Sequence, residues 1–483
     1  MGETLKEKTA KGLFWGGLNN GVQQAIGLVF GIILARLLSR DDYGMMAMIS
    51  VFSLIATTLQ NSGFTTALAN MKEPKAEDYN SVFWFNIIVG TSAYIILFFC
   101  APLIARFNHT DKLVWLCRYA FLSIVIASFG TAQNAWLFKN LKAKQQAKAS
   151  MTAVILSSIT GATCAVCGLA YWSLATQGLV YVLINTLLAW HYSHWRPTIH
   201  NISFAPAKRM FRFSCKILAS NIANIINNNI LNLLLGHYFS PHDTGDYNQA
   251  YQWDSKVFML IQGMLGQVAQ PVLVGISGEK ERQMAVMRKM IRFAAFLSFP
   301  MLLGFGLVAK EFIVVAIGKK WLVSAGYIQI LCFAGATMPI FTVLSNMVIS
   351  KGRSGLYLVA TAGLGIVQIV TMVLIRQGGI SAMVVAYTII NIVWLFVWHG
   401  MVWRLTSYNI GQFLKDILPF AISALGVMII THFATLPIHN LLLLLFARII
   451  MAAVLYYAIM RVVHAQILLE CQNFILGKIR KRK

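Results

Sequence analysis

Charge is what this sequence lacks most. Only 12% of its 483 residues are charged, while 58% are hydrophobic. Soluble domains carry about 25% charged residues, so this chain has too few to cover the surface of a soluble globule. It contains instead many apolar runs of about 18 residues or more, each long enough to cross a membrane. We therefore expect an all-α integral membrane protein, because irregular backbone cannot face lipid.

Motifs of catalysis are also lacking. The sequence contains no GxSxG, HExxH or paired carboxylates, and no phosphate-binding GxxxxGK[ST]. The loops between the apolar runs are shorter than about 20 residues, which leaves no room for a soluble catalytic domain. We expect no enzyme activity, no nucleotide hydrolysis and no cofactor.

Cysteine is sparse, with seven residues. Cys164 and Cys167 form a CxxC in "GATCAVCGLAYW", but no histidine or acid lies near them in the sequence. We interpret both as small packing residues of a membrane helix and predict no metal site.

Acidic residues are few, 16 against 40 lysines and arginines, which gives a net charge of +24. The basic residues occupy short loops and the tail "LGKIRKRK", with no basic domain that could bind nucleic acid. This distribution is typical of cytoplasmic loops and of attraction to anionic membrane lipids.

The apolar runs predict about fourteen transmembrane helices. Their expected ranges are 12–36, 44–70, 80–105, 112–138, 150–174, 176–195, 211–236, 246–276, 288–317, 322–350, 354–376, 379–403, 414–434 and 440–466. An even number places both termini on one side. That side carries roughly 27 of the 40 lysines and arginines, so both termini are expected in the cytoplasm.

Two loops have nearly the same sequence: "LLSRDDYG" at 37–44 and "YFSPHDTGDY" at 238–247. Without a gap, the matched pairs are Asn20 with Asn221, Leu34 with Leu235, Ser39 with Ser240, Asp42 with Asp243 and Gly44 with Gly245. We expect Ser and Asp to cap the next helix and Gly to occupy a tight turn.

The match predicts two parallel six-helix lobes around a central cavity, at 1–200 and 201–405. Two further helices and the basic tail follow at 406–483. Parallel repeats of this kind are typical of transporters that work by alternating access. The alternative is an old duplication in a structural membrane protein.

Amide side chains recur inside two of the predicted spans. Asn19, Asn20, Gln23 and Gln24 share one face of the first span by their spacing, and Asn221, Asn224 and Asn228 repeat along the seventh. Such residues either bond one helix to another or line a wet cavity. We favour the cavity, with Asn20, Gln23, Gln24, Asn221, Asn224 and Asn228 as candidate substrate-binding residues.

Ionisable residues inside the spans are rarer. Asp254 is the only acid that lies clearly within a predicted span, and Lys256 faces away from it. Arg118 and Lys256 are deep enough either to line the cavity, where they would suit an anionic diphosphate, or to form structural ion pairs. Lys216 and Arg448 lie near span ends, where snorkelling to the headgroups explains them.

The opening "GLFWGGLNN…ILARLLSRDDYGMMAMISVFSLIATTLQNSGFTTAL" resembles the Wzx-type polysaccharide flippases, in particular the colanic-acid exporter branch. Their superfamily also holds the multidrug exporters and the lipid II flippase. Further similar segments are "GHYFSPHDTGDYNQAYQW", "MRKMIRFAAFLSFPMLLGFGLVAKEF" and "IGKKWLVSAGYIQIL", so the resemblance covers about residues 10–350.

The resemblance implies movement of an undecaprenyl-diphosphate-linked oligosaccharide from the cytoplasmic to the periplasmic leaflet of a bacterial inner membrane. An ion gradient or the membrane potential would drive it. Family members often carry charged residues at the positions of Asn61, Asn228 and Leu231, so Asp254 is the remaining candidate for ion coupling. Polysaccharide polymerases and glycosyltransferases of the same pathway are candidate partners.

Three other functions stay open. A drug or cation antiporter of the same superfamily would be expected to carry a cluster of acids in one lobe. A polysaccharide polymerase or ligase would carry a large outer loop with catalytic residues. A scaffolding membrane protein would not need amide-rich helix faces.

Overall fold

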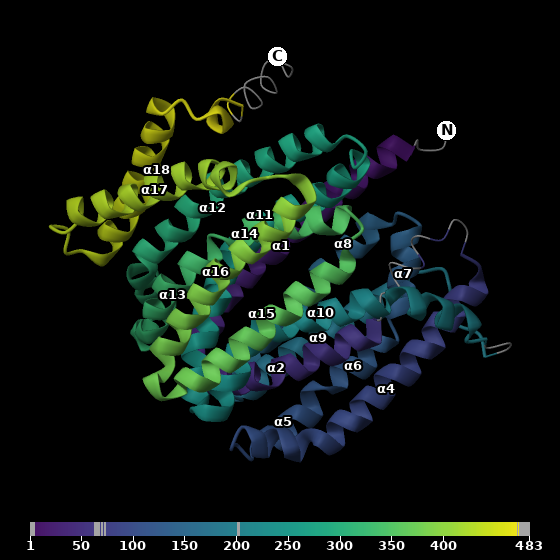
Figure 1. Cartoon of the computed structure of the whole chain (residues 1–483). Helices are drawn as coiled ribbons and strands as arrows, with labels where there is room; N and C mark the ends of the chain where they lie inside the picture. Colours follow the sequence, from purple (N-terminus) through teal and green to yellow (C-terminus); the bar gives the residue numbers. More distant parts are fainter. Residues whose placement is uncertain are drawn as a thin grey trace. The chain divides into compact units, whose positions relative to one another are not determined.

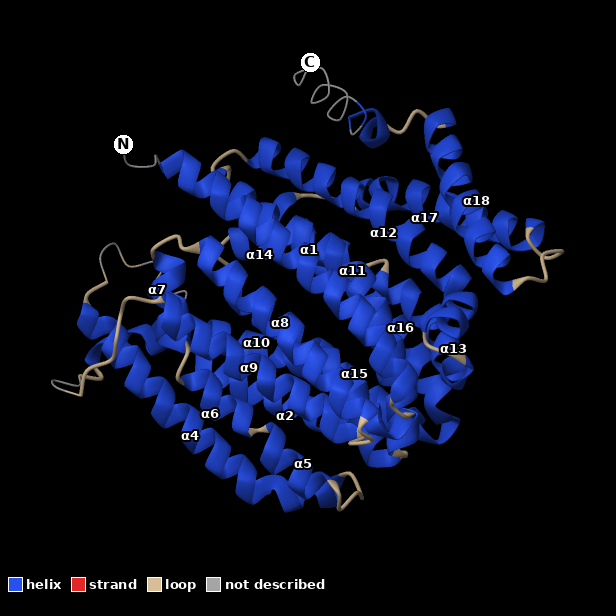
Figure 2. Cartoon of the chain, turned by 180° about the vertical axis from the view of Figure 1, so that it is seen from behind, coloured by secondary structure: helices blue, strands red, loops and turns tan. Residues whose placement is uncertain are grey.

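The computed structural model describes residues 5–61, 68, 71, 74–199, 203–470 and 472, and these residues form helices and loops without a strand (Figures 1 and 2). Side chains are described for most of this range, but those of Asn61 and Lys216 lie outside it. The predicted all-α architecture is confirmed.

Close contacts divide the chain into two compact units, Met1–Gly245 and Asp246–Lys483. The first contains α1 (Leu5–Leu37), α2 (Arg40–Asn61), α4 (Ala76–Phe107), α5 (Leu113–Ala120), α6 (Leu122–Ser128), α7 (Thr131–Lys139), α8 (Ala143–Val166), α9 (Tyr171–Tyr192) and α10 (Ala205–Tyr238). In this unit α10 packs on α2 and α4. The division into lobes at 1–200, 201–405 and 406–483 stays a prediction.

The second unit is built on one long helix. It contains most of α11 (Pro241–Gly275), then α12 (Lys280–Ala316), α13 (Leu322–Gly335), α14 (Met338–Ser350), α15 (Ser354–Ile375), α16 (Gly379–Thr406), α17 (Ile410–Ala434) and α18 (Leu441–Val462). Helix α12 packs against α13, α14, α17 and α18. The largest fully buried side chains described in this unit are those of Trp321, Trp398, Tyr247, Tyr408 and Phe413.

The described residues hold 11 helical stretches that are long and apolar enough to cross a membrane, or up to 12 with one bent pair. The predicted number of fourteen is therefore not confirmed. Two stretches, Lys319–Ser350 and Ser354–Thr406, each contain two α-helices, and the bent pair has a 44° break between Ser128 and Thr131. Helix α10 is not among the candidates, and its many asparagines lower its hydropathy.

The two similar loops begin their helices in the same way. Ser39 Oγ accepts a hydrogen bond from Asp42 N at 3.2 Å, while Asp42 Oδ2 accepts from Ser39 N at 2.8 Å. Ser240 and Asp243 repeat this arrangement before α11. Each pair is a capping box that satisfies the free N–H groups of a first helical turn. The predicted caps are confirmed.

The sequence predicted tight turns at the two matched glycines, and this prediction is wrong. Both lie in the first turns of helices α2 and α11 with ordinary helical backbone. Their role is close approach: a Cβ on Gly44 would lie 1.8 Å from the carbonyl oxygen of Pro241. A Cβ on Gly245 would lie 2.0 Å from the carbonyl oxygen of Arg40. The two helix starts therefore pack on each other reciprocally, and only glycine fits at either place.

Candidate functional site: polar residues within the helices

The four amides of α1 separate into two stripes. Gln23 Nε2 donates to Asn19 Oδ1 at 3.0 Å, and Ser150 Oγ of α8 donates to the same oxygen at 2.7 Å. This stripe joins α1 to α8, as in the hydrogen-bonding alternative. Asn20 and Gln24 form the other stripe, and both are exposed.

The amides of α10 also divide. Asn221 and Asn228 are exposed and Asn224 is half-buried, whereas Asn227 and Asn232 are buried. An exposed amide on a membrane helix is costly against lipid unless it meets water or another polar group. Asn20, Gln24, Asn221 and Asn228 are thus the predicted cavity residues whose exposure fits a wet surface. Gln23 is half-buried and bonds to Asn19.

Arg118 lies among aromatic rings of the first unit. Its guanidinium carbon is 4.3 Å from the ring centre of Phe98 and 5.0 Å from that of Trp115. The side chain is half-buried, and its Nε has no hydrogen-bond partner among the described residues. Cation–π contacts of this kind stabilise a cation away from water. Arg118 forms no ion pair with another described residue.

Lys256 and Asp254 occupy different environments on α11. The Lys256 ammonium lies 4.0 Å from the ring centre of Trp253. Asp254 is 3% exposed and packs against the backbone of Gly335 in α13, where a Cβ would be 2.8 Å from its Oδ1. That oxygen accepts no hydrogen bond from the described residues. The structure therefore keeps the two charges apart, and this confirms the prediction from their spacing that Lys256 faces away from Asp254.

The surroundings of Asp254 are polar but uncharged. Tyr247, Tyr251 and Tyr387 lie close enough to interact with it electrostatically, and so does Cys332. The hydroxyl of Tyr247 has no partner among the described residues. A carboxyl group in such a place is stable when a proton neutralises it or when a bound cation balances its negative charge.

Two buried acids of the second unit correct the expectation that Asp254 stands alone. Asp416 of α17 receives two hydrogen bonds from Arg288 of α12, Nε to Oδ2 at 2.7 Å and Nη2 to Oδ1 at 3.0 Å. Glu311 of α12 pairs with Arg448 of α18 at 2.9 Å. Both acids lie inside candidate spans. The sequence signal that could have found the first pair is the spacing of Arg288 and Arg292, which share a helix face.

Arg448 does not snorkel, contrary to the expectation from its place near a span end. Its side chain is 8% exposed and donates to Glu311 Oε1, to Thr435 Oγ1 at 3.1 Å and to the carbonyl oxygen of Leu307 at 3.2 Å. These contacts bind α18 to α12 and to the end of α17. The partner acid lies far away in the sequence, so local spacing gave no sign of it.

The long apolar helices and the polar residues within them define a polytopic membrane protein. Residues 33–326 match the family described as "Polysaccharide biosynthesis protein", and the chain belongs to that family. It is 25% identical over 356 residues to the lipopolysaccharide biosynthesis protein WzxC of Escherichia coli (strain K12), covering 72% of this chain and 71% of that protein. It is 22% identical to the teichuronic acid biosynthesis protein TuaB of Bacillus subtilis (strain 168), over 87% of this chain and 88% of that protein.

Solved structures with the same fold include the lipid II flippase MurJ in an inward closed conformation. The TM-score is 0.76 at 13% identity, covering 94% of this chain and all of that chain. An inward-facing multidrug transporter of the MATE family gives a TM-score of 0.64 at 16% identity, over 80% of this chain and 96% of that one. At these identities the likeness concerns the fold.

Proposed function

We propose that the chain flips an oligosaccharide carried on undecaprenyl diphosphate from the cytoplasmic to the periplasmic leaflet of a bacterial inner membrane, by alternating access. Membership of the polysaccharide biosynthesis family is the observation that carries this proposal. The name of another relative, the succinoglycan biosynthesis transport protein ExoT of Rhizobium meliloti, agrees with transport in such a pathway.

The exposed amides support a passage for sugars. Asn20 and Gln24 on α1, with Asn221 and Asn228 on α10, offer donors and acceptors that match hydroxyl groups. The lipid tail would stay in the bilayer while the sugars and the diphosphate pass along these side chains. Arg118 and Lys256 remain candidates for the diphosphate, because each cation is balanced by aromatic rings rather than by an acid.

The proposed orientation follows from the charge distribution of the sequence. Both termini are proposed to lie in the cytoplasm, because the loops on their side carry most of the basic residues. Anionic lipids would contact these loops. Polymerases and glycosyltransferases of the same pathway are the proposed protein partners.

The direct test reconstitutes the purified chain in vesicles and measures the arrival of a lipid-linked oligosaccharide at the opposite leaflet. We expect transport by the wild type and a loss of about tenfold or more in Asn20→Leu/Gln24→Leu, since each lost hydrogen bond to a sugar weakens binding by about 0.5–1.5 kcal/mol. Thr163→Leu is the matched control, because Thr163 is exposed but bonds to its own helix at Ile159 O. Wild-type vesicles that move a cationic drug and no oligosaccharide would support the antiporter instead.

Asp254 is proposed to couple transport to an ion. It is a buried acid for which the described residues supply no cation and no hydrogen bond to Oδ1. Uptake and release of a proton or cation at this carboxylate would change the local charge by one. Such a change is large in a site of low dielectric constant, and so it can bias two conformations.

We expect Asp254→Asn to retain the fold and to abolish the dependence of flipping on pH or membrane potential, because the amide cannot change its charge. The measurement is the flipping rate across a series of imposed pH gradients and potentials. Asp111→Asn, at an exposed acid in the loop before α5, is the control and should follow the wild type. An unchanged dependence in Asp254→Asn would assign the coupling elsewhere.

A further inference from the structure

Helices α11 and α12 leave a cavity between them in the second unit. Close to their connection the helices are tied together, because Gln283 Nε2 donates to the carbonyl oxygen of Leu273 at 2.7 Å. One turn further along α12 a cavity of about 310 Å³ opens. This volume is at the lower end of the range of roughly 300–1,000 Å³ that small-molecule sites occupy.

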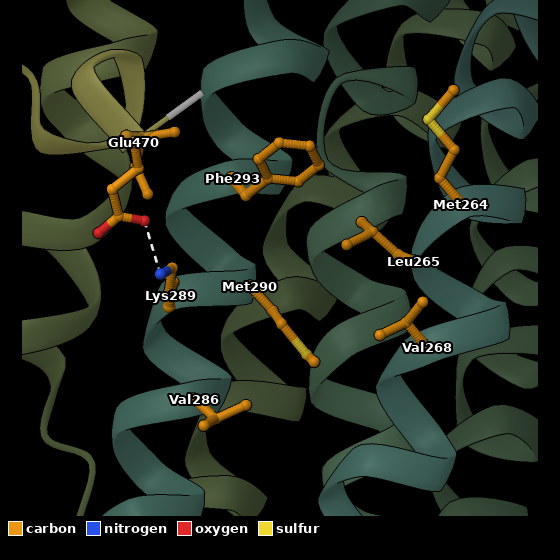
Figure 3. A pocket seen from close by; sticks show the side chains of 9 residues that line it. Met264, Leu265, Val268, Val286, Lys289, Met290, Phe293 and Glu470 are labelled. Atoms are coloured by element: carbon orange, nitrogen blue, oxygen red, sulfur yellow. Dashed lines mark ion pairs between the residues drawn. The ribbon is translucent and has the colours of Figure 1, made fainter. Parts of the chain in front are cut away.

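The wall of the cavity is apolar and its rim is charged. Figure 3 shows Leu265 and Val268 of α11 on one side, and Met290 and Phe293 of α12 on the other. At the rim the ammonium of Lys289 pairs with Glu470 at 2.6 Å (Figure 3). The side chain of Lys289 is 59% exposed and that of Glu470 is 50% exposed. An exposed pair of this kind contributes little and exchanges easily.

Two further cations lie on the same turn of α12. Arg288 and Arg292 share the single carboxylate of Asp416, to which Tyr408 also donates a hydrogen bond at 2.8 Å. Burial raises the pKa of Tyr408, and its bond to Asp416 raises it further, so the hydroxyl stays a donor. Arg292 Nε is 3.4 Å from Asp416 but makes no hydrogen bond among the described residues.

Among the described residues, the charges on this turn do not balance. Three cations, Arg288, Lys289 and Arg292, face two carboxylates, those of Asp416 and Glu470. Lys289 and Arg292 are three residues apart and so are neighbours on the helix surface. The excess of one positive charge therefore lies beside the rim of the apolar cavity.

The depth of this turn is that of lipid headgroups. Helix α12 has 37 residues and so is about 55 Å long, whereas the hydrocarbon core is about 30 Å thick. If the helix is centred, each end projects by roughly 12 Å. Lys289 lies nine residues from Lys280, or about 14 Å along the helix, so it is close to the boundary of the hydrocarbon.

We propose that this turn binds one anionic phospholipid of the surrounding bilayer. An acyl chain fills the cavity between α11 and α12, and the phosphodiester lies between Lys289 and Arg292, where it adds its charge to that of Glu470. A phosphodiester carries one negative charge and so matches the excess of one positive charge, whereas a polyprenyl diphosphate carries more. The site is independent of the proposed transport of oligosaccharide.

The experiment measures lipid binding to the full chain by native mass spectrometry and by thermal stabilisation. The probes are dioleoyl phosphatidylglycerol, dioleoyl phosphatidylcholine with the same chains, undecaprenyl diphosphate, and glycerol phosphate without chains. We expect one phosphatidylglycerol per chain, bound at least about fivefold more tightly than phosphatidylcholine, as expected for one charge near a membrane surface. Glycerol phosphate should not bind at the same concentration.

Four variants locate the site. Lys289→Gln/Arg292→Gln should abolish the preference for phosphatidylglycerol, and Val268→Trp should lower the affinity for both lipids by filling the cavity. Glu470→Gln should raise the affinity for phosphatidylglycerol, because Lys289 loses its competing partner. Arg282→Gln is the control, since Arg282 is on the same helix but pairs with exposed Glu279.

Three results would overturn the proposal. They are no preference for phosphatidylglycerol in the wild type, an unchanged preference in the Lys289→Gln/Arg292→Gln variant, and tighter binding of undecaprenyl diphosphate than of phosphatidylglycerol. If the double variant fails to fold, Glu470→Gln decides instead, since it removes only an exposed carboxylate. No gain in affinity there would show that Lys289 does not meet the phosphate.

Discussion

Gly44→Ala and Gly245→Ala are each expected to destabilise the protein strongly. The added methyl groups would meet backbone carbonyl oxygens at 1.8 Å, from Pro241, and at 2.0 Å, from Arg40. Backbone atoms cannot turn away as a flexible side chain can, so the two helix starts must move apart. Overpacking costs about 1–3 kcal/mol in ordinary cores, and contacts this short should reach or exceed the upper value.

The measurement is the melting temperature of each purified variant in one detergent. Gly21→Ala in α1 and Gly263→Ala in α11 are matched controls, because a Cβ at either position would meet nothing within 4 Å. Alanine also favours helix over glycine by about 1 kcal/mol, so both controls should melt at or above the wild-type temperature. A wild-type melting temperature for Gly44→Ala would mean that the two helix starts do not approach each other as closely as described.

These glycines show what the sequence could and could not predict. The repeated pattern of Ser, Asp and Gly correctly predicted two similar helix starts, because capping is a local property of three or four residues. It gave the wrong reason for the glycines. The reciprocal approach of two backbones depends on tertiary packing, and neither loop alone contains that information.

The helices themselves could be predicted well, because long apolar runs have few alternatives in a membrane. The expected span 112–138 is an exception in detail, since the structure breaks it into α5, α6 and α7. The break falls at Phe129 and Gly130, where a Cβ on the glycine would meet Thr186 Oγ1 at 3.0 Å. A close contact again fixes a feature that hydropathy does not detect.

The polar residues could be found from the sequence but not assigned to a partner. Spacing placed Asn19 and Asn20 on one broad face, but only the position of Ser150 in α8 shows that Asn19 binds a neighbouring helix. The same holds for Asp416, whose arginines come from a helix more than one hundred residues earlier. Periodicity gives the angle of a side chain on its own helix, and partners on other helices need the fold.

Arg448→Gln is the second variant with a large expected effect. The sequence placed Arg448 at the headgroups, but the structure buries the Arg448–Glu311 pair at 8% and 6% side-chain exposure. Removing the arginine leaves Glu311 as a buried acid without its cation, and its Oε2 already lacks a partner among the described residues. Breaking a buried pair in this way costs about 3–5 kcal/mol, so the variant should unfold at a clearly lower temperature.

The double variant Glu311→Gln/Arg448→Gln separates the charge from the packing. Removing both charges removes the buried unpaired acid, so the double variant should recover much of the stability that Arg448→Gln loses. Arg461→Gln is the control, because Arg461 is an exposed cation near the end of the same helix. Melting temperatures of the wild type, Glu311→Gln, Arg448→Gln and the double variant in one detergent complete the cycle. If Arg448→Gln melts with the wild type, Arg448 reaches the headgroups after all, and α18 is held by its apolar contacts alone.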